Sequence, residues 1–185
     1  MNTIITSKEA ILNESKKLII EQGYSALNIR SVASACGVSV GSIYNYFKSK
    51  SDLLSATIES IWQEIFHHHG SFQSFEDIQM CIRWLYECLE YGNEKYPGFF
   101  ELHSLGFVGN EKDDGKEKMH QTWQHILSNL CEVLECDTKI RKDAFTEQFT
   151  SEKCADIIFS LLLASVIKKD YDCSAILEVV KRTLY

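Results

Sequence analysis

The segment from residue 39 to residue 46 combines hydrogen-bonding and aromatic side chains without one acidic group. The side chains in it that can form hydrogen bonds are Ser39, Ser42, Tyr44, Asn45 and Tyr46. Lys48 and Lys50 follow at once. Lysines and free backbone amides suit phosphate oxygens, whereas short polar or methyl-bearing groups suit base edges. Gly41 would let the backbone approach a ligand closely, at a cost in helix propensity that an ordinary solvated helix has no need to bear. The pattern indicates a surface that binds a polyanion.

Two short helices are predicted to position this surface. Asn28 can cap the first, in which apolar residues recur with helical spacing up to the next glycine. Ser39 can cap the second, which we expect to run to about Tyr46. Ile43 and Phe47, four positions apart, would face the core. Two short helices joined by a tight turn are typical of the helix-turn-helix, whose second helix enters the major groove of DNA.

The composition describes a globular chain with unevenly distributed charge. Of 185 residues, 45% are hydrophobic, 24% are charged and one is proline, which excludes disordered and collagen-like classes. The net charge is −7, yet residues 1–50 hold six Lys/Arg against three acids, a net of +3. The remaining residues hold 13 basic against 23 acidic side chains, a net of −10. Binding to nucleic acid should therefore use the amino-terminal part.

We expect a cytoplasmic protein that has no membrane contact, cofactor or metal. The longest strongly apolar stretch, residues 157–167, is too short to cross a bilayer, and the first residues lack the features of a signal peptide. Seven cysteines form no CxxC pair, so reduced thiols are expected, most of them buried. The three histidines at 67–69 are adjacent, so on a helix they point about 100° apart and cannot share one ion.

Helical start and stop signals recur along the chain, while alternating strand patterns are scarce. A capping box of Thr6 and Glu9 predicts a first helix over about residues 7–22. In all, we expect an all-α fold of about nine helices. The predicted domains are a three-helix, helix-turn-helix DNA-binding domain at 1–48 and a helical ligand-binding and dimerisation domain at 49–185. A helix over about 49–69 would connect them.

The run from Asn28 to Leu54 resembles the DNA-binding signature of the tetracycline-repressor (TetR) family of bacterial transcription regulators. The resemblance is carried by G-V-S-x-G-x-I-Y-x-Y-F-x-x-K-x-x-L and, upstream, by E-Q-G-Y-S-A-L. It covers about residues 7–55, and the rest of the chain resembles the family only in being helical and of ordinary length. The resemblance implies a homodimer on a palindromic double-stranded DNA operator, and a repressor that a small-molecule ligand releases.

By position in the motif, the resemblance assigns DNA contacts to Asn28, Arg30, Ser39, Val40, Gly41, Ser42, Tyr44, Asn45, Tyr46, Lys48 and Lys50. Asn28 stands where the family most often has threonine. The second helix of the motif contains no Lys or Arg, which leaves Asn45 for adenine and Val40 for a thymine methyl group.

Each of these residues also has a purely structural interpretation. Ser39 can cap its helix with or without DNA, and the side chain of Tyr44 can pack in the corner between the helices. Arg30, Lys48 and Lys50 can be solvated charges.

For an apolar or aromatic ligand, the candidate pocket residues are Trp62, Trp84, Phe99, Phe100, His103, Phe107, Met119 and Trp123. Ordinary core packing accounts for each of them equally well. The nearly continuous apolar run at 155–167 and the amphipathic helix ending at Leu184 match the two C-terminal helices through which the family dimerises. The competing interpretation is a central buried helix in a monomer.

Three classes of function follow. The first is a ligand-responsive, DNA-binding regulator. The alternative is a TetR-like regulator without a small-molecule ligand, controlled by a protein partner. An enzyme is not expected, because the chain lacks a G-x-S-x-G elbow, a phosphate-binding glycine loop and an H-E-x-x-H pair.

Overall fold

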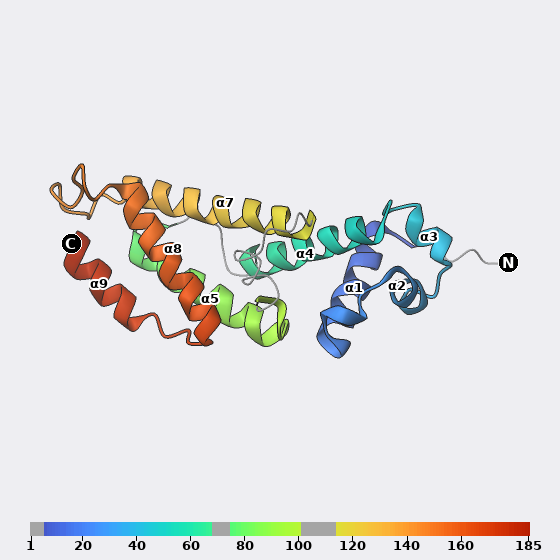
Figure 1. The fold of residues 1–185 in the computed structure, drawn as a ribbon. Helices are drawn as coiled ribbons and strands as arrows, with labels where there is room; N and C mark the ends of the chain where they lie inside the picture. Colours follow the sequence, from blue (N-terminus) through green and yellow to red (C-terminus); the bar gives the residue numbers. More distant parts are fainter. Residues whose placement is uncertain (1–5, 68–74, 101–113) are drawn as a thin grey trace. The chain divides into compact units, whose positions relative to one another are not determined.

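All regular structure in the described part of the chain is helical. The computed structural model describes residues 6–67, 75–100 and 114–185 (Figure 1). Over those residues the α-helices are α1 (Lys8–Gln22), α2 (Ile29–Ala35), α3 (Val40–Tyr44), α4 (Lys50–His67), α5 (Ile78–Lys95), α7 (Asp114–Cys136), α8 (Ser151–Lys168) and α9 (Ser174–Leu184). A 3-10 turn, η1 (Tyr24–Ala26), follows α1. The predicted all-α fold is confirmed.

The described residues hold eight of the roughly nine expected α-helices. Of the helix expected after Pro97, only Phe99 and Phe100 lie in the described part, and both are helical. His103, which was assigned to the same helix, lies outside the described residues.

The chain forms two compact units. The first consists of residues 1–64 and 93–119, so it holds α1 to α3 and most of α4. The second consists of residues 65–92 and 120–185, with most of α5 and α7, and all of α8 and α9. The expected boundary between a DNA-binding domain and a ligand-binding domain at residue 48 stays a prediction.

Side-chain caps fix where the amino-terminal helices begin. Ser7, rather than the predicted Thr6, caps α1, and its hydroxyl accepts from the backbone N of Ala10 at 3.1 Å. Asn28 caps α2 as predicted, and Ser31 reciprocates by accepting from the backbone N of Asn28. The shift at α1 is a single residue, because Thr6 and Ser7 are both good caps and the bond to N3 selects Ser7.

The amino-terminal helices enclose a small apolar core. The side chains in it that are at most 2% exposed are Ile11, Ile19, Val32, Ile43, Phe47 and Leu53. They come from α1, α2, α3 and α4 and from the turn after α3, so each helix contributes one face. Burial of such a side chain stabilises the fold by about 1.5–3 kcal/mol, which is what holds helices as short as α2 and α3 in place.

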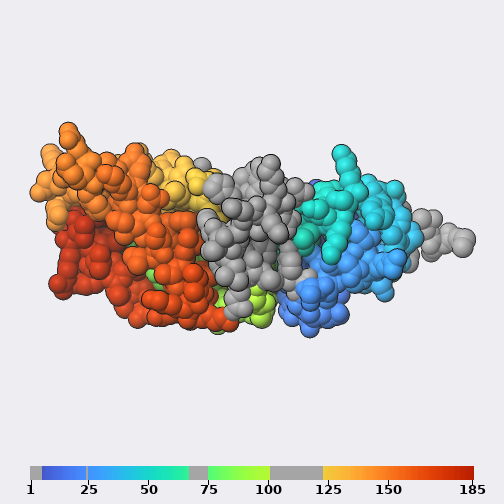
Figure 2. Space-filling model, in the orientation of Figure 1, coloured from blue at the N-terminus to red at the C-terminus, as the bar shows by residue number. Residues whose placement is uncertain are grey.

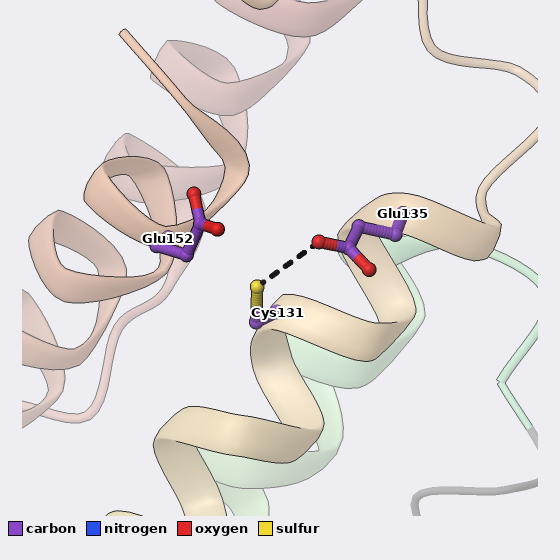
Figure 3. Close-up of side chains that lie close together, drawn as sticks. All are labelled: Cys131, Glu135 and Glu152. Carbon is purple, nitrogen blue, oxygen red and sulfur yellow. Dashed lines mark hydrogen bonds between the residues drawn. The ribbon is translucent and has the colours of Figure 1, made fainter.

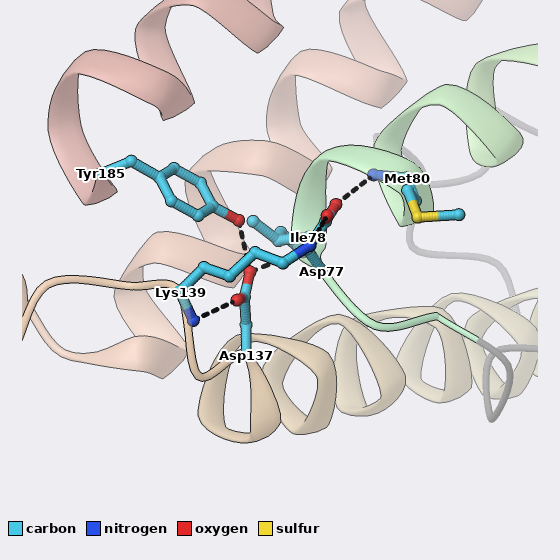
Figure 4. A network of polar contacts seen from close by, with 6 residues as sticks. All are labelled: Asp77, Ile78, Met80, Asp137, Lys139 and Tyr185. Carbon is cyan, nitrogen blue, oxygen red and sulfur yellow. Dashed lines mark hydrogen bonds and ion pairs between the residues drawn. The ribbon is translucent and has the colours of Figure 1, made fainter.

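A polar network joins distant parts of the second unit (Figure 4). The buried carboxylate of Asp137, just after α7, accepts from the backbone N of Ile78 at 3.1 Å and of Lys139 at 2.9 Å. It also accepts from the phenol of Tyr185, the residue after α9. The ammonium group of Lys139 pairs with Asp77 at 2.8 Å. The start of α5, the end of α7 and the end of α9 are thereby held together.

No described helix is both long enough and apolar enough to cross a membrane.

Candidate nucleic-acid interface

The turn between α2 and α3 requires glycine at one position. Gly37 has φ 65°, in the left-handed region that side chains other than glycine rarely adopt. The backbone N of Gly37 bonds to the carbonyl of Ser34 at 3.1 Å, and that of Val38 bonds to the carbonyl of Ala33 at 3.0 Å. These bonds satisfy the free carbonyls at the end of α2 and fix the direction in which the chain leaves it.

The start of α3 is capped as the sequence predicts. The Ser39 hydroxyl accepts from the backbone N of Ser42 at 3.1 Å, and the two serine hydroxyls lie 2.9 Å apart. A Cβ added at Gly41 would meet only the Ser39 hydroxyl, at an ordinary contact distance of 3.7 Å. The fold itself therefore does not require glycine at position 41.

Helix α3 ends at Tyr44, two residues earlier than expected. The backbone N atoms of Tyr46 and Phe47 both bond to the carbonyl of Ile43 at 3.0 Å, which closes the helix in a tight turn. Ile43 and Phe47 are 0% and 1% exposed, so the predicted inward face is confirmed. These two anchors orient the opposite face of α3 toward solvent.

The outward face of α3 carries unusually large exposed side chains. Val40 is 38% exposed, Tyr44 is 51% exposed and Tyr46 is 41% exposed. Asn45 lies between the two tyrosines and is exposed as well. No residue of this face is acidic. The outward face of α3 is therefore exposed, partly apolar and aromatic, and free of acids.

Tyr46 has an additional structural task. Its phenol donates to the backbone carbonyl of Thr6, just before α1, at 2.5 Å. The hydroxyl is thus committed within the fold, and the exposed ring is what remains available to a partner. The sequence pattern gave no sign of this contact, because the two residues are 40 positions apart.

The predicted phosphate-binding residues lie around α3. Lys48 is exposed just before α4, Lys50 is the exposed first residue of α4, and Arg30 is exposed in the first turn of α2. Asp52, in the first turn of α4, accepts from the backbone N of Lys48 at 2.8 Å. The Asn28 side chain accepts from the backbone N of Arg30 at 3.0 Å and donates to the carbonyl of Ala26, so its amide is used by the fold.

The described pocket candidates form separate aromatic clusters. In the first unit, Trp62 packs against Phe99 and Phe100, with ring centroids 5.3 and 5.4 Å apart. In the second unit, Trp84 packs against Phe66 and Phe75, and Trp123 packs against Phe159. The candidates Trp62, Trp84, Phe99, Phe100 and Trp123 are all 1–4% exposed. His103 and Phe107, and the side chain of Met119, lie outside the described residues.

A charged cluster beside the first aromatic group was missed by sequence reasoning. Glu64 of α4 accepts from Lys16 of α1 at 2.7 Å and also from Lys95 at the end of α5. Burial alone would raise the pKa of Glu64, but the hydrogen bonds and charges of the two lysines outweigh it and lower that pKa to about 2. No local spacing could reveal these pairs, which join residues 48 and 31 positions apart.

A capped, acid-free helix presented on a helix-turn-helix scaffold defines a DNA-binding protein of the helix-turn-helix class. Residues 11–57 match the family model of bacterial regulatory proteins of the tetR family. These matched residues, which include α2 and α3, therefore carry the DNA-binding sequence pattern of the TetR family of transcription regulators.

Individual relatives agree with this assignment. The regulator YerO of Bacillus subtilis is 42% identical over 52 residues, which cover 28% of this chain and 18% of YerO. The regulator QacR of Staphylococcus aureus is 24% identical over 131 residues, which cover 65% of this chain and 68% of QacR. The match thus spans less than a fifth of YerO's length.

The whole fold also has a counterpart among solved structures. The regulator FadR of Bacillus subtilis, solved in complex with stearoyl-CoA, superimposes with a TM-score of 0.70. The superposition covers 97% of this chain and 100% of the FadR chain, and the two sequences are 17% identical. The two proteins share the same fold.

Proposed function

We propose that this protein is a repressor that binds a palindromic operator as a homodimer and is released from it by a small apolar or aromatic molecule. The observation that carries the proposal is the outward face of α3, where Val40, Tyr44 and Asn45 are exposed and no acid intervenes. Burial of Ile43 and Phe47 holds that face rigidly outward, as a surface that enters the major groove requires.

The exposed side chains divide into two roles. Asn45 can read adenine through its amide, and Val40 can contact a thymine methyl group. Lys48 and Lys50 supply charge for phosphates, assisted by the backbone amides at the start of α4. Tyr44 and the ring of Tyr46 contact sugar and phosphate. Arginine readout of guanine is absent from α3, which has no Lys or Arg, so we expect an operator whose recognised steps are rich in A and T.

Dimerisation is assigned to α8 and α9, whose side chains lie next to one another on one face of the second unit (Figure 2, orange and red). Ile157 and Leu161 on α8 are 52% and 41% exposed, and Val179 on α9 is 56% exposed. Large apolar side chains gathered on one face favour burial against a second copy. The same pair of helices can form a four-helix bundle across a twofold axis.

Ligand control is assigned to the first unit, where the aromatic cluster and the Glu64 ion pairs lie on the same stretch of α4. Trp62 contacts Phe99 and Phe100, and two residues later Glu64 binds Lys16 of α1. A ligand that separates the rings would displace α4. Through the ion pair with Lys16 it would also displace α1, the first helix of the predicted DNA-binding domain. Operator affinity then falls by the factor by which the ligand prefers the displaced arrangement of α1 and α4 over the DNA-binding one. The complex of FadR with stearoyl-CoA suggests a long apolar chain as the first class of ligand to test.

A second candidate function follows from how tightly the described aromatic residues are packed. Trp62, Phe99 and Phe100 are at most 3% exposed and their rings pack against one another. A regulator of this fold without a small-molecule ligand, controlled by a protein partner, would have such a filled cluster. The two functions differ in whether any small molecule changes operator affinity.

The deciding experiment is selection of bound duplexes from a random DNA pool by the full chain, repeated with acyl-CoA esters and a metabolite library. The proposal expects an enriched palindrome, a dimer in sedimentation, and loss of binding with at least one compound. Enrichment that no compound alters would favour control by a protein partner. A pool that shows no enriched sequence would refute DNA recognition by α3.

A further inference from the structure

Three metal-ligating side chains converge where α7 meets α8 in the second unit (Figure 3). Cys131 and Glu135 lie four residues apart on α7, and therefore on the same face of that helix. Glu152 faces them from the first turn of α8. One ligand atom from each of the three residues lies within 4.8 Å of the other two. Cys131 is half-buried, and both glutamates are exposed.

We propose that Cys131, Glu135 and Glu152 form a binding site for a divalent transition metal of the zinc type. A thiolate with two carboxylates suits a borderline-soft ion, whereas Mg²⁺ and Ca²⁺ select oxygen ligands alone. Zinc accepts sulfur and carboxylate ligands together, and three protein ligands leave a fourth position for water. The proposal concerns a site separate from the DNA-binding face and does not depend on the proposed function.

The distance between Cys131 and Glu135 fits a tetrahedral ion. The Cys131 sulfur lies 3.5 Å from a carboxylate oxygen of Glu135. Zinc–sulfur and zinc–oxygen bonds of about 2.3 and 2.1 Å at a tetrahedral angle place the two ligand atoms about 3.6 Å apart. One edge of the tetrahedron is thus already formed. The ligand atom of the exposed Glu152 lies within 4.8 Å of the other two, and rotation of its side chain would bring it to the third position.

The Ser151 hydroxyl lies beside all three groups of the cluster. It lies 3.0 Å from the carboxylate of Glu135, 3.8 Å from the sulfur of Cys131 and 3.5 Å from the carboxylate of Glu152. In the metal-free protein this hydroxyl bridges the three groups by hydrogen bonds. A bound ion would replace those bonds with coordination, and Ser151 would then bond to a coordinated carboxylate or water.

The charge of the cluster also favours a cation. Neither Glu135 nor Glu152 forms an ion pair with any Lys, Arg or His in the described part of the chain. Both side chains are carboxylates, and a bound cation would offset the repulsion between their negative charges. On binding, the Cys131 thiol loses its proton to solvent and the metal takes the place of that proton. Coordination then links the end of α7 directly to the start of α8.

Cobalt(II) binding by the full, untagged chain tests the site, because thiolate-to-cobalt charge transfer absorbs in the near ultraviolet only when sulfur is a ligand. We expect one cobalt ion per chain with that absorption, displaced by Zn²⁺. Cys131→Ser should abolish the absorption, and Glu135→Gln should weaken binding by about 100-fold. Cys136→Ser is the matched control, since Cys136 is an exposed thiol at the end of the same helix and should leave the signal unchanged.

A second measurement covers the stability of the variants. Zn²⁺ should raise the melting temperature of the wild type and of Cys136→Ser, but not of Cys131→Ser, because a ligand that binds only the folded state stabilises it. Circular dichroism without metal should be the same for all three proteins. The proposal is overturned if Cys131→Ser retains the charge-transfer absorption, or if the wild type shows no sulfur-ligated cobalt at all. If cobalt bound only through histidine or carboxylate groups, the wild type would show no sulfur-to-cobalt absorption, and the proposal would be overturned.

Discussion

Glu64 of α4 and Lys16 of α1 form an ion pair of 2.7 Å that links α4 to α1. The side chains are only 23% and 15% exposed, so the pair is partly shielded from water. Lys95 donates to the other oxygen of the same carboxylate. One side chain therefore holds α1, α4 and the end of α5 together.

Glu64→Gln should lower the free energy of unfolding by about 1–2 kcal/mol, between the values of exposed and buried pairs. The pKa of Glu64 is lowered from an ordinary 4.5 to about 2 in the folded protein. Its stabilisation is therefore complete above pH 4.5 and lost as the pH falls toward 2. Urea denaturation from pH 7 to pH 2.5 should show the two proteins converging in stability at the acid end.

Glu21→Gln is the matched control for that change, because Glu21 is an exposed glutamate on α1. It should leave stability nearly unchanged across the same pH range. A constant difference between wild type and Glu64→Gln down to pH 2.5 would contradict the ion-pair explanation.

Lys50→Ala and Asn45→Ala should weaken operator binding in different ways. Lys50→Ala removes a phosphate contact, so it should lower affinity about equally on all sequences. It should also reduce the slope of log affinity against log salt concentration by about one. Asn45→Ala instead removes an adenine contact, so it should relax the preference at one base pair by about 1–3 kcal/mol. Fluorescence anisotropy on an operator and its single-base variants, at several salt concentrations, separates the two. Equal losses on every sequence from both substitutions would refute this division of roles.

Leu161→Glu should convert the proposed dimer to monomer, because it places a charge in the centre of the apolar α8 and α9 face. Met80→Glu is the control, since Met80 is 49% exposed on α5, outside that face. Sedimentation velocity should show a dimer for the wild type and for Met80→Glu only. If Leu161→Glu remains dimeric, the interface lies elsewhere.

Tyr185→Phe should destabilise the second unit by about 1.5–3 kcal/mol, the range for a hydrogen bond to a charged group. The phenol of Tyr185 donates to the buried carboxylate of Asp137, and burial together with that carboxylate raises the pKa of the phenol. The substitution keeps the ring and removes only the hydroxyl. Thermal unfolding monitored by circular dichroism measures the change, and an unchanged melting temperature would show that the bond contributes nothing.

Much of the amino-terminal part follows from local sequence alone. The caps at Asn28 and Ser39 and the inward face of Ile43 and Phe47 were predicted and are confirmed. The errors there were small and local, with the cap of α1 at Ser7 rather than Thr6 and the end of α3 at Tyr44 rather than Tyr46. Caps and helical faces depend on residues three or four positions apart, so a sequence displays them directly.

The remaining features depend on tertiary packing. Glu64 meets Lys16 and Lys95, Tyr46 meets Thr6, and Glu152 reaches Cys131 only because helices distant in sequence pack against each other. Side-chain direction across such contacts is set by the helix axes and their rotation, which no local pattern records. The sequence by itself therefore determined the family resemblance, the positions of most helices and the exposed, acid-free face of α3. The folded chain decided which charges, thiols and carboxylates meet, since those distances exist only after the cores have formed.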